Sequence, residues 1–403
     1  MATKKQALER ATYVILRGGA DGTRDIFRGG VRPESLGGPA ELKVEVERLD
    51  RAGVARVAQL GSVQAIARAM PMRLIAPVAK PKAARPVAGG MSWGIGAVGA
   101  DVSAFNGHEA VVAVLDTGID PAHPAFAGVN LVQKDFTGEG NGDNHGHGTH
   151  CAGTIFGRAV GGQRIGVAPG VAKALIGKVL GGNGGSSDVI ANAIQWAVEN
   201  GANVVSMSLG IDFPGFVDQL VKQNGMPIAL ATSYALEGYR ANVQLFEKLA
   251  ALVRTQSLFG RAALIVAAAG NESERDTDPN FEISVSPPAV AEGIISVAAL
   301  GQSPKGLVVA PFSNTGANIA APGVNVVSAK AGGGLASMSG TSMATPHVAG
   351  VAALWYDKIK AEAGSVATAT FGARLIASGV SKGLRPGIDM TDVGAGLVRA
   401  PKN

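Results

Sequence analysis

A series of short apolar runs, each followed by residues with helical spacing, restricts the fold of this chain more than any other feature. The runs are rich in Val, Ile, Leu and Ala, which is typical of strands buried on both faces. Their alternation with helices predicts an α/β fold with a mostly parallel central sheet and helices on both faces. The predicted strands are 111–116, 174–179, 203–208, 263–268 and 293–298, and the clearer predicted helices are 147–156, 187–200, 342–360 and 370–377.

Length and composition indicate one large domain with a small appendage. The chain has 403 residues, of which 46% are hydrophobic and 57 are glycine, so we expect a large core with many tight turns. The formal net charge is only +5, and the basic residues do not alternate with aromatic ones, so no nucleic-acid partner is expected. The single cysteine, Cys151, excludes an intramolecular disulfide and a cysteine-zinc site.

Nothing in the sequence predicts contact with a membrane. The first residues are charged and no apolar segment follows them, and no apolar run approaches the length of a membrane span. We therefore expect a cytoplasmic protein without a membrane partner. Export without a leader stays open as an alternative.

Three parts are expected along the chain. Residues 1–75 form a small α+β module, residues 76–92 are a linker rich in Pro, Lys and Gly, and residues 93–403 form the α/β domain. A polar, helical insertion interrupts this domain at about 212–260. The expected elements of the module and the insertion are strands at 11–16, 42–49 and 72–75, helical spacing at 54–70, and helices at 216–223 and 236–253.

The segment 339–350 places a serine at the start of an apolar helix. Ser342 follows Gly340 and Thr341, at a point where backbone N–H groups are unpaired within the helix and carry the positive end of its dipole. An oxyanion forming beside the Ser342 hydroxyl would meet hydrogen-bond donors there. On this segment alone, a helix cap is as good an interpretation as a nucleophile.

Two distant residues favour the nucleophile. Asp116 ends an apolar run, at the carboxyl end of a strand, where open α/β sheets build their sites. His147 lies among small residues that permit close helix packing. Asp, His and Ser in this order match one of the known orders of a catalytic triad. Such a set is required chemically, because serine is a weak nucleophile at neutral pH and needs a base to take its proton.

Each of these residues also has a simpler interpretation. Asp116 could cap a turn, and Asn271, after Gly270, resembles an ordinary turn asparagine. The histidines could instead bind a metal ion, although the chain lacks a His-Glu-x-x-His pattern. The residues of that candidate cluster are Asp143, His145, His147 and His150.

Four motifs follow one another in order between about residue 93 and residue 400. They are Asp116-Thr117-Gly118-Ile119-Asp120, His147-Gly148-Thr149-His150, Ala268-Ala269-Gly270-Asn271 and Gly340-Thr341-Ser342-Met343-Ala344-Thr345-Pro346. Together they resemble the motifs of the subtilases, the subtilisin-type serine proteases. The resemblance implies an endopeptidase that cleaves proteins or peptides through an acyl-enzyme and requires no cofactor. Asp116, His147 and Ser342 would form its triad, and Asn271 would donate a hydrogen bond to the oxyanion.

The resemblance also implies where a substrate binds. Subtilases pair an extended peptide with backbone edges that correspond here to Ser208-Leu209-Gly210 and Ala268-Ala269-Gly270. A side-chain preference is expected from the loop 272–287, whose acids either favour basic residues or are merely solvated. These acids are Glu274, Asp276, Asp278 and Glu282.

Two features near the histidine motif bear on metals. Ala125 stands where a calcium-binding aspartate is common in subtilases, and the loop 157–164 lacks a commonly ligating asparagine. Calcium needs several oxygen ligands, so the family's usual tight site is not expected, while a calcium site of carbonyl oxygens or other ligands stays open. Cys151 follows the histidine motif, as in proteinase K-like subtilases, where a buried thiol lies beneath the histidine. We expect a small core residue there and inhibition by a mercurial.

The N-terminal part resembles a shortened subtilase propeptide over residues 42–75. This implies that the chain's own N-terminal segment blocks the cleft until the linker is cut, while a permanent partner-binding module is the alternative. The insertion at 212–260 could shape or cover the cleft. Two other functions stay open: a regulatory protein that keeps a subtilase shell without turnover, and a metal-dependent hydrolase built on the histidine cluster.

Overall fold

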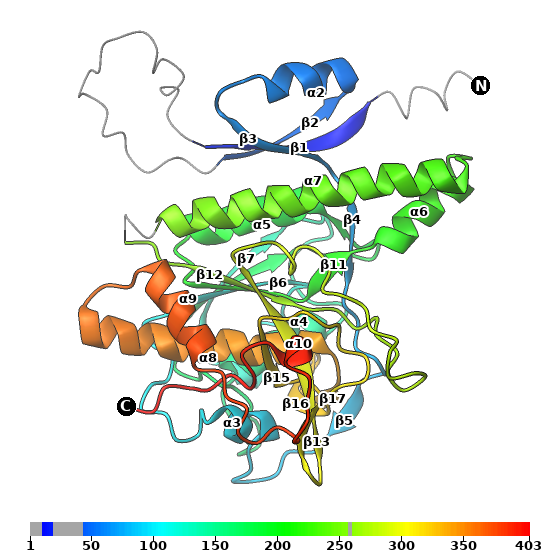
Figure 1. Ribbon diagram of the computed structural model, residues 1–403. Coiled ribbons are helices and arrows are strands. Elements are labelled where there is room, and N and C mark those ends of the chain that lie inside the picture. The colour runs from blue at the N-terminus through cyan, green and yellow to red at the C-terminus, as the bar shows by residue number, and fades with distance from the viewer. Residues whose placement is uncertain (1–9, 19–42, 257–259) are drawn as a thin grey trace.

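A sheet of mainly parallel strands lies at the centre of the molecule (Figure 1). The computed structural model describes residues 10–18, 43–256 and 260–403. The strand order is β14-β13-β12-β10-β6-β8-β7, with β15 also paired to β13, and each pair is parallel except β13 with β14. The strands are β6 (Val111–Asp116), β7 (Asn130–Asp135), β8 (Lys173–Lys178), β10 (Val204–Met207), β12 (Leu264–Ala268), β13 (Ile294–Ser303), β14 (Gly306–Val309) and β15 (Ile319–Pro322).

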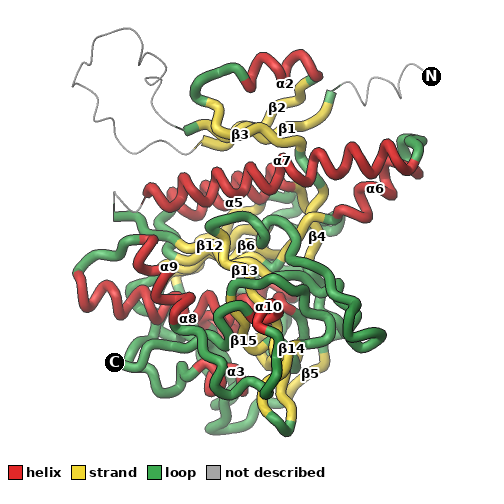
Figure 2. The backbone as a smooth tube through the Cα atoms, viewed as in Figure 1, coloured by secondary structure: helices red, strands yellow, loops and turns green. Residues whose placement is uncertain are grey.

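Helices cover both faces of the sheet, which confirms the predicted α/β class (Figure 2). Helices α5 (Ser187–Glu199) and α7 (Ile228–Thr255) lie on one face, and α8 (Thr341–Ala363) and α9 (Thr368–Ala377) lie on the other. Helix α4 (His147–Phe156) packs against α8. The shorter helices are α3 (Trp93–Val98), the 3-10 turn Pro124–Phe126 and α10 (Met390–Val393). Within the described ranges, no helix is both long and apolar enough to cross a membrane.

Each predicted strand and helix of this domain is present, with shifts of a few residues at most ends. Three strands of the central sheet, among the described residues, were not indicated by the apolar pattern: β14, β15 and β7. The longest of them is β7. It lies at an edge of the sheet and reads Asn-Leu-Val-Gln-Lys-Asp, so its polar side chains reach solvent. An edge strand needs no continuous apolar run, and for that reason the pattern of a buried strand misses it.

The N-terminal module is a small antiparallel sheet in the order β2-β1-β3, with one helix (Figure 1). The helical spacing at 54–70 is wrong beyond residue 58, because α2 (Arg51–Ala58) ends there and β3 (Val63–Arg68) follows. Strand β3 pairs with β1 (Ala11–Arg17), and this tertiary pairing overrides the local helical pattern. Strand β2 (Lys43–Leu49) agrees with the predicted strand 42–49, whose first residue, Leu42, lies outside the described residues.

The insertion lies under the N-terminal module. It forms α6 (Phe213–Lys222) and the whole of α7, which passes beneath the module's sheet (Figure 1). The Arg68 guanidinium lies 4.7 Å from the ring centre of Tyr234 and 5.9 Å from that of Phe216. Asn242 Nδ2 donates to the Arg68 carbonyl oxygen at 2.8 Å. The insertion therefore holds the end of β3, from which the chain continues into the linker.

The chain from residue 71 to residue 91 is paired with the large domain along most of its length. Side chains of 76–90 are mostly exposed, but the backbone is not free. Strand β4 (Pro71–Leu74) forms a small sheet with β11 (Leu209–Ile211) and β9 (Gly185–Ser186). Strand β5 (Lys82–Ala84) adds to a hairpin of β16 (Val326–Ala329) and β17 (Leu335–Met338). The linker is thus fixed on the surface of the large domain.

Candidate active site

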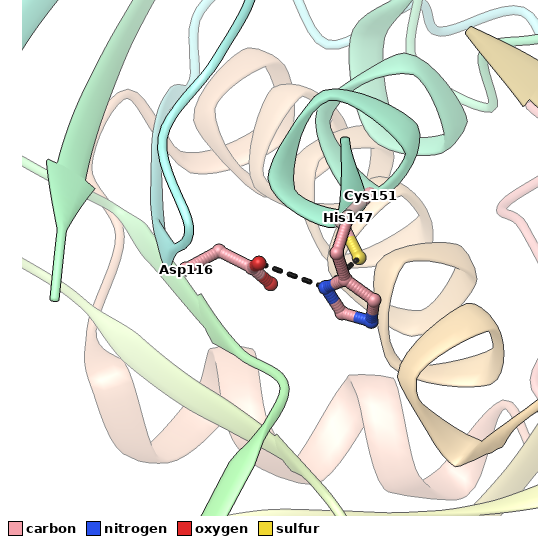
Figure 3. Close-up of side chains that lie close together, drawn as sticks. All are labelled: Asp116, His147 and Cys151. Carbon is pink, nitrogen blue, oxygen red and sulfur yellow. Dashed lines mark hydrogen bonds and ion pairs between the residues drawn. The ribbon is translucent and has the colours of Figure 1, made fainter. Parts of the chain in front are cut away.

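Asp116 and His147 form a buried pair at the carboxyl end of the central sheet (Figure 3). Asp116 is the last residue of β6 and His147 the first residue of α4. The Asp116 Oδ1 and His147 Nδ1 atoms are 2.7 Å apart. Because a carboxylate accepts hydrogen bonds, Nδ1 is the donor, and Nε2 of the neutral ring is left as the proton acceptor. Nε2 is buried and has no hydrogen-bond partner among the described residues.

Gly148 permits the close approach that creates this pair. A Cβ atom on Gly148 would lie 2.1 Å from the Gly118 carbonyl oxygen and 3.2 Å from the Asp116 Cβ. Any residue with a Cβ atom at this second position of α4 would force the helix and the end of β6 apart. Asp143 fixes the preceding turn, since its carboxylate accepts hydrogen bonds from the backbone N–H groups of Gly146 and Thr149.

The charges around the imidazole favour its protonated form. Burial disfavours the imidazolium, but the adjacent Asp116 carboxylate favours it through its charge and its hydrogen bond, and the pKa of His147 is raised well above its ordinary value. His150 behaves in the opposite way. Its burial, with His147 nearby, lowers the pKa of His150 to about 3, and its Nε2 faces the carbonyl oxygens of Val326 and Ala336. His150 is therefore a neutral, structural histidine.

Ser342 and Asn271 meet at the start of α8. Ser342 is the second residue of that helix and is completely buried. Asn271 has a fixed orientation, because its Oδ1 accepts from the backbone N–H of Thr341 at 2.9 Å and from the Thr341 hydroxyl at 2.9 Å. Its Nδ2 donor therefore points away from the helix. This is the orientation that an oxyanion donor beside Ser342 requires.

Cys151 lies where the two helix starts meet. Its Sγ atom is 3.7 Å from His147 Nδ1 and 3.4 Å from the Ser342 carbonyl oxygen (Figure 3). Burial raises the pKa of the Cys151 thiol. The thiol thus packs behind the imidazole as a small neutral core residue.

The chain's own residues 71–78 run over these side chains, between β11 and β9, and the space that they fill is called the groove. Strand β4 pairs antiparallel with β11, with Arg73 opposite Gly210, and the Ile75 N–H donates to the Ser208 carbonyl oxygen at 3.2 Å. Beyond the serine, the Val78 N–H donates to the Ser339 carbonyl oxygen at 2.9 Å. An extended peptide is therefore bound on both sides of Ser342.

Ser342 and Asn271 contact different carbonyls of this segment. The Ser342 hydroxyl donates to the Ile75 carbonyl oxygen at 2.6 Å, whereas Asn271 Nδ2 donates to the Ala76 carbonyl oxygen at 2.9 Å. Acyl transfer needs the nucleophile at the carbon of the same carbonyl whose oxygen the donor holds. In this arrangement the serine proton also points to Ile75 and not to His147 Nε2. The segment is extended and paired through its backbone, but Ser342 and Asn271 do not meet at one of its carbonyls.

Only one of the two predicted binding edges pairs with residues 71–78. Ser208, Leu209 and Gly210 pair with β4. The backbone groups of Ala268, Ala269 and Gly270 are instead bonded inside the large domain, to β13, Asn314 and Thr341. The pairing edge expected at 268–270 is therefore not seen. The second edge is β9, which pairs with Pro71 and Met72. The glycine-rich run 181–185, which leads into β9, was the sequence feature that could have indicated this edge.

The candidate metal cluster does not form. The Asp143 carboxylate is occupied by hydrogen bonds to its own turn, and the His150 ring faces carbonyl oxygens on another side. Within the described part of the chain, the one set of three potential ligands with converging atoms is Asp116, His147 and Cys151, all within 4.8 Å of one another. These are the buried Asp116–His147 pair and the thiol behind it, so the histidine cluster offers no separate site among the described residues.

Comparisons with known proteins agree with this geometry. The model of the subtilase family matches residues 107–379, which include Asp116, His147, Asn271 and Ser342. M-protease of Shouchella clausii (strain KSM-K16) is 37% identical over 274 residues, or 65% of this chain and 58% of that protein. The major intracellular serine protease of Bacillus subtilis (strain 168) is 35% identical over 253 residues, or 60% and 67% of the two chains.

Subtilisin Savinase of Lederbergia lenta is 37% identical over 274 residues, which cover 65% of this chain and 82% of the relative. The match thus spans less than two thirds of M-protease but most of this shorter relative. The family match covers more than half of the chain and includes Asp116, His147, Asn271 and Ser342. This chain belongs to the subtilase family.

Proposed function

We propose that this chain is a serine endopeptidase that cleaves proteins or peptides through an acyl-enzyme on Ser342. The observation that carries the proposal is the fixed Asn271 amide, which already holds a peptide carbonyl at 2.9 Å beside a serine and an Asp–His pair. A substrate would bind in place of residues 71–78, with its backbone paired to β11 and β9.

The reaction follows from the positions of these groups. His147 Nε2 takes the Ser342 Oγ proton as Oγ attacks the substrate carbonyl carbon, and Asn271 Nδ2 donates to the oxygen that becomes negative. Asp116 holds the imidazole tautomer and stabilises the imidazolium. The C–N bond then breaks, and His147 returns the proton to the leaving amine. Water attacks the acyl-enzyme by the same route and restores the serine.

The N-terminal segment acts in this proposal as an intramolecular inhibitor. It fills the groove, its Ile75 carbonyl oxygen accepts the hydrogen bond of the Ser342 hydroxyl, and its Ala76 carbonyl oxygen accepts that of Asn271 Nδ2. Residues 1–75 then form an inhibitory module, residues 76–92 a surface strap, and residues 93–403 the enzyme. Activity requires the segment to leave the groove or to be cut. The insertion contacts Arg68 and so holds the N-terminal module against the large domain. This contact favours an inhibitory module over a permanent binding site for another protein.

The loop 157–164 does not fit the family's calcium site. Two of its oxygens accept hydrogen bonds from the linker: the Gly162 carbonyl from the Gly89 N–H at 3.2 Å, and Gln163 Oε1 from the Val87 N–H at 3.0 Å. The Arg164 guanidinium donates to the carbonyl oxygens of Ala100 and Val167, each at 3.1 Å. Protein donors hold the loop that calcium would otherwise hold, so the proposed mechanism needs no metal.

Hydrolysis of casein by three preparations tests the function. The wild-type chain, after loss of its N-terminal segment, should hydrolyse casein, and the Ser342→Ala variant should fall to about the level left by binding and the oxyanion donor alone, roughly 10³–10⁴ above the uncatalysed reaction. EDTA should leave the wild-type rate unchanged. No hydrolysis by folded wild-type protein would favour the regulatory shell, and activity that survives Ser342→Ala but stops in EDTA would favour the metal hydrolase.

A cytoplasmic location belongs to the same proposal. It is supported by the similarity to a relative whose name describes an intracellular serine protease. Immunodetection of the protein in cytosol and in culture medium of its own cells tests it, and a signal in the medium alone would contradict it.

A further inference from the structure

The N-terminal segment places one charged side chain at a fixed position in the groove. Arg73 is opposite Gly210 in the β4–β11 ladder, two residues before Ile75. Its Nη1 atom lies 3.1 Å from Asp212 Oδ1, and its Nη2 atom lies 3.1 Å from Glu272 Oε1. The side chain of Arg73 is 44% exposed, and those of Asp212 and Glu272 are 28% and 34% exposed. The guanidinium is thus held between two carboxylates at the rim of the groove.

The large domain positions both carboxylates without help from Arg73. Asp212 directly follows β11 and caps α6, since its Oδ1 accepts from the Gly215 N–H at 3.1 Å. Glu272 directly follows the oxyanion donor Asn271, and its Oε2 accepts from Asn314 Nδ2 at 2.8 Å. Because these bonds lie within the large domain, the two carboxylates stay in place when the segment leaves.

We infer that Asp212 and Glu272 form a subsite that selects a basic side chain two positions before the residue whose carbonyl Ser342 attacks. The inference rests on the proposed endopeptidase function. A substrate that replaces β4 pairs with the same backbone groups of β11, so its register is the register of β4. Its side chain at this position therefore lies where the Arg73 side chain lies, between the two acids.

The preference for a basic side chain comes from two acids and not from the whole acidic loop 272–287. Glu282 pairs with Arg275 at 3.1 Å, and Asp278 accepts from the Asn280 N–H at 2.8 Å, so both face their own loop. Glu272, at the start of the loop, and Asp212, on the opposite wall at the head of the insertion, are the two that meet Arg73. The insertion thus contributes directly to the groove.

Fluorogenic peptides with the chain's own sequence before the scissile bond provide the test. The peptides are Met-X-Leu-Ile-aminomethylcoumarin with Arg, Gln or Glu at X, and the enzyme is the full chain, with open active sites counted by a fluorophosphonate. The Arg peptide should have a kcat/KM about 5- to 30-fold above that of the Gln peptide, as two partly screened ion pairs allow. The Glu peptide should be poorer still.

The difference should lie in KM and not in kcat, because the charge contact is the same in the ground and transition states. It should shrink as NaCl is raised to 1 M, where charge interactions at a rim are largely screened. The Asp212→Asn/Glu272→Gln double variant should lose the preference, and Asp276→Asn, which removes an exposed acid of the same loop, should keep it. Asn at 212 can still cap α6.

The outcomes separate this inference from the function on which it rests. Equal kcat/KM for the Arg and Gln peptides, with all peptides hydrolysed, overturns the inference and leaves the endopeptidase intact. A preference for the Arg peptide that persists in the double variant or at 1 M NaCl also overturns the inference. The salt series uses the wild-type chain, so this test does not depend on whether a variant folds. Failure to hydrolyse any peptide or casein contradicts the proposed function instead.

Discussion

Replacing Arg68 with alanine should loosen the N-terminal segment and expose Ser342. The Arg68 guanidinium contacts the rings of Tyr234 and Phe216, at 4.7 and 5.9 Å from their centres. Each cation–π contact contributes about 0.5–2 kcal/mol, depending on its burial, so the two together contribute about 1–4 kcal/mol. Part of that gain is offset, because Nη1 of Arg68 is buried without a hydrogen-bond partner among the described residues. We therefore expect a net loss of about 1–2 kcal/mol, or about 5- to 30-fold in the open population.

The labelling rate of Ser342 by a fluorophosphonate measures that population. Ser342 is fully buried and its hydroxyl is bonded to Ile75, so the probe reacts only when the segment has left. The intact mass of the still uncut chain should show label appearing about 5- to 30-fold faster in Arg68→Ala than in wild type. Arg48→Ala, which removes an exposed arginine of the same module, is the matched control. Equal rates in Arg68→Ala and wild type, with both proteins folded, would refute the account of docking.

Three further predictions follow from the site and its surroundings. His147 must be neutral to accept the serine proton, and Asp116 raises the pKa of His147, so kcat/KM should fall as the pH drops through a midpoint above 6.5; a midpoint below 6.5 would contradict the raised pKa. Mercuric ion should inhibit slowly through Cys151, which is buried behind the imidazole, and a Cys151→Ala variant that is inhibited equally would disprove this route. EDTA should leave the melting temperature unchanged, whereas a tight calcium site filled at 100 times its Kd would contribute about 2.7 kcal/mol and a drop of several degrees.

The sequence predicts the large domain well because its strands are buried on both faces. Runs such as 111–116 and 263–268 are continuously apolar and do not show the spacing of an amphipathic helix. Their strands differ from the prediction by at most one residue at either end. The pattern fails where burial is incomplete. It missed the edge strand β7, and it predicted helical spacing over β3, whose pairing with β1 is a tertiary effect.

The catalytic candidates could be named from local motifs, because each motif serves a close contact. Gly148 permits the approach of α4 to β6, and Gly340 and Thr341 lead the chain into α8 beside Asn271. The groove could not be derived in the same way. Its second edge, β9, and its acidic rim depend on which distant segments meet. The 268–270 edge was inferred from the family and is internally bonded here, whereas the acid that meets Arg73 from the insertion, Asp212, carried no local signal.

The most direct test of the central claim is the intact mass of the purified chain, followed over time with a fluorophosphonate present. The account predicts that label appears on Ser342, that labelling accelerates when the N-terminal segment is lost, and that Ser342→Ala takes up none. Folded protein that has lost the segment and remains unlabelled would contradict the claim that this groove holds a serine nucleophile.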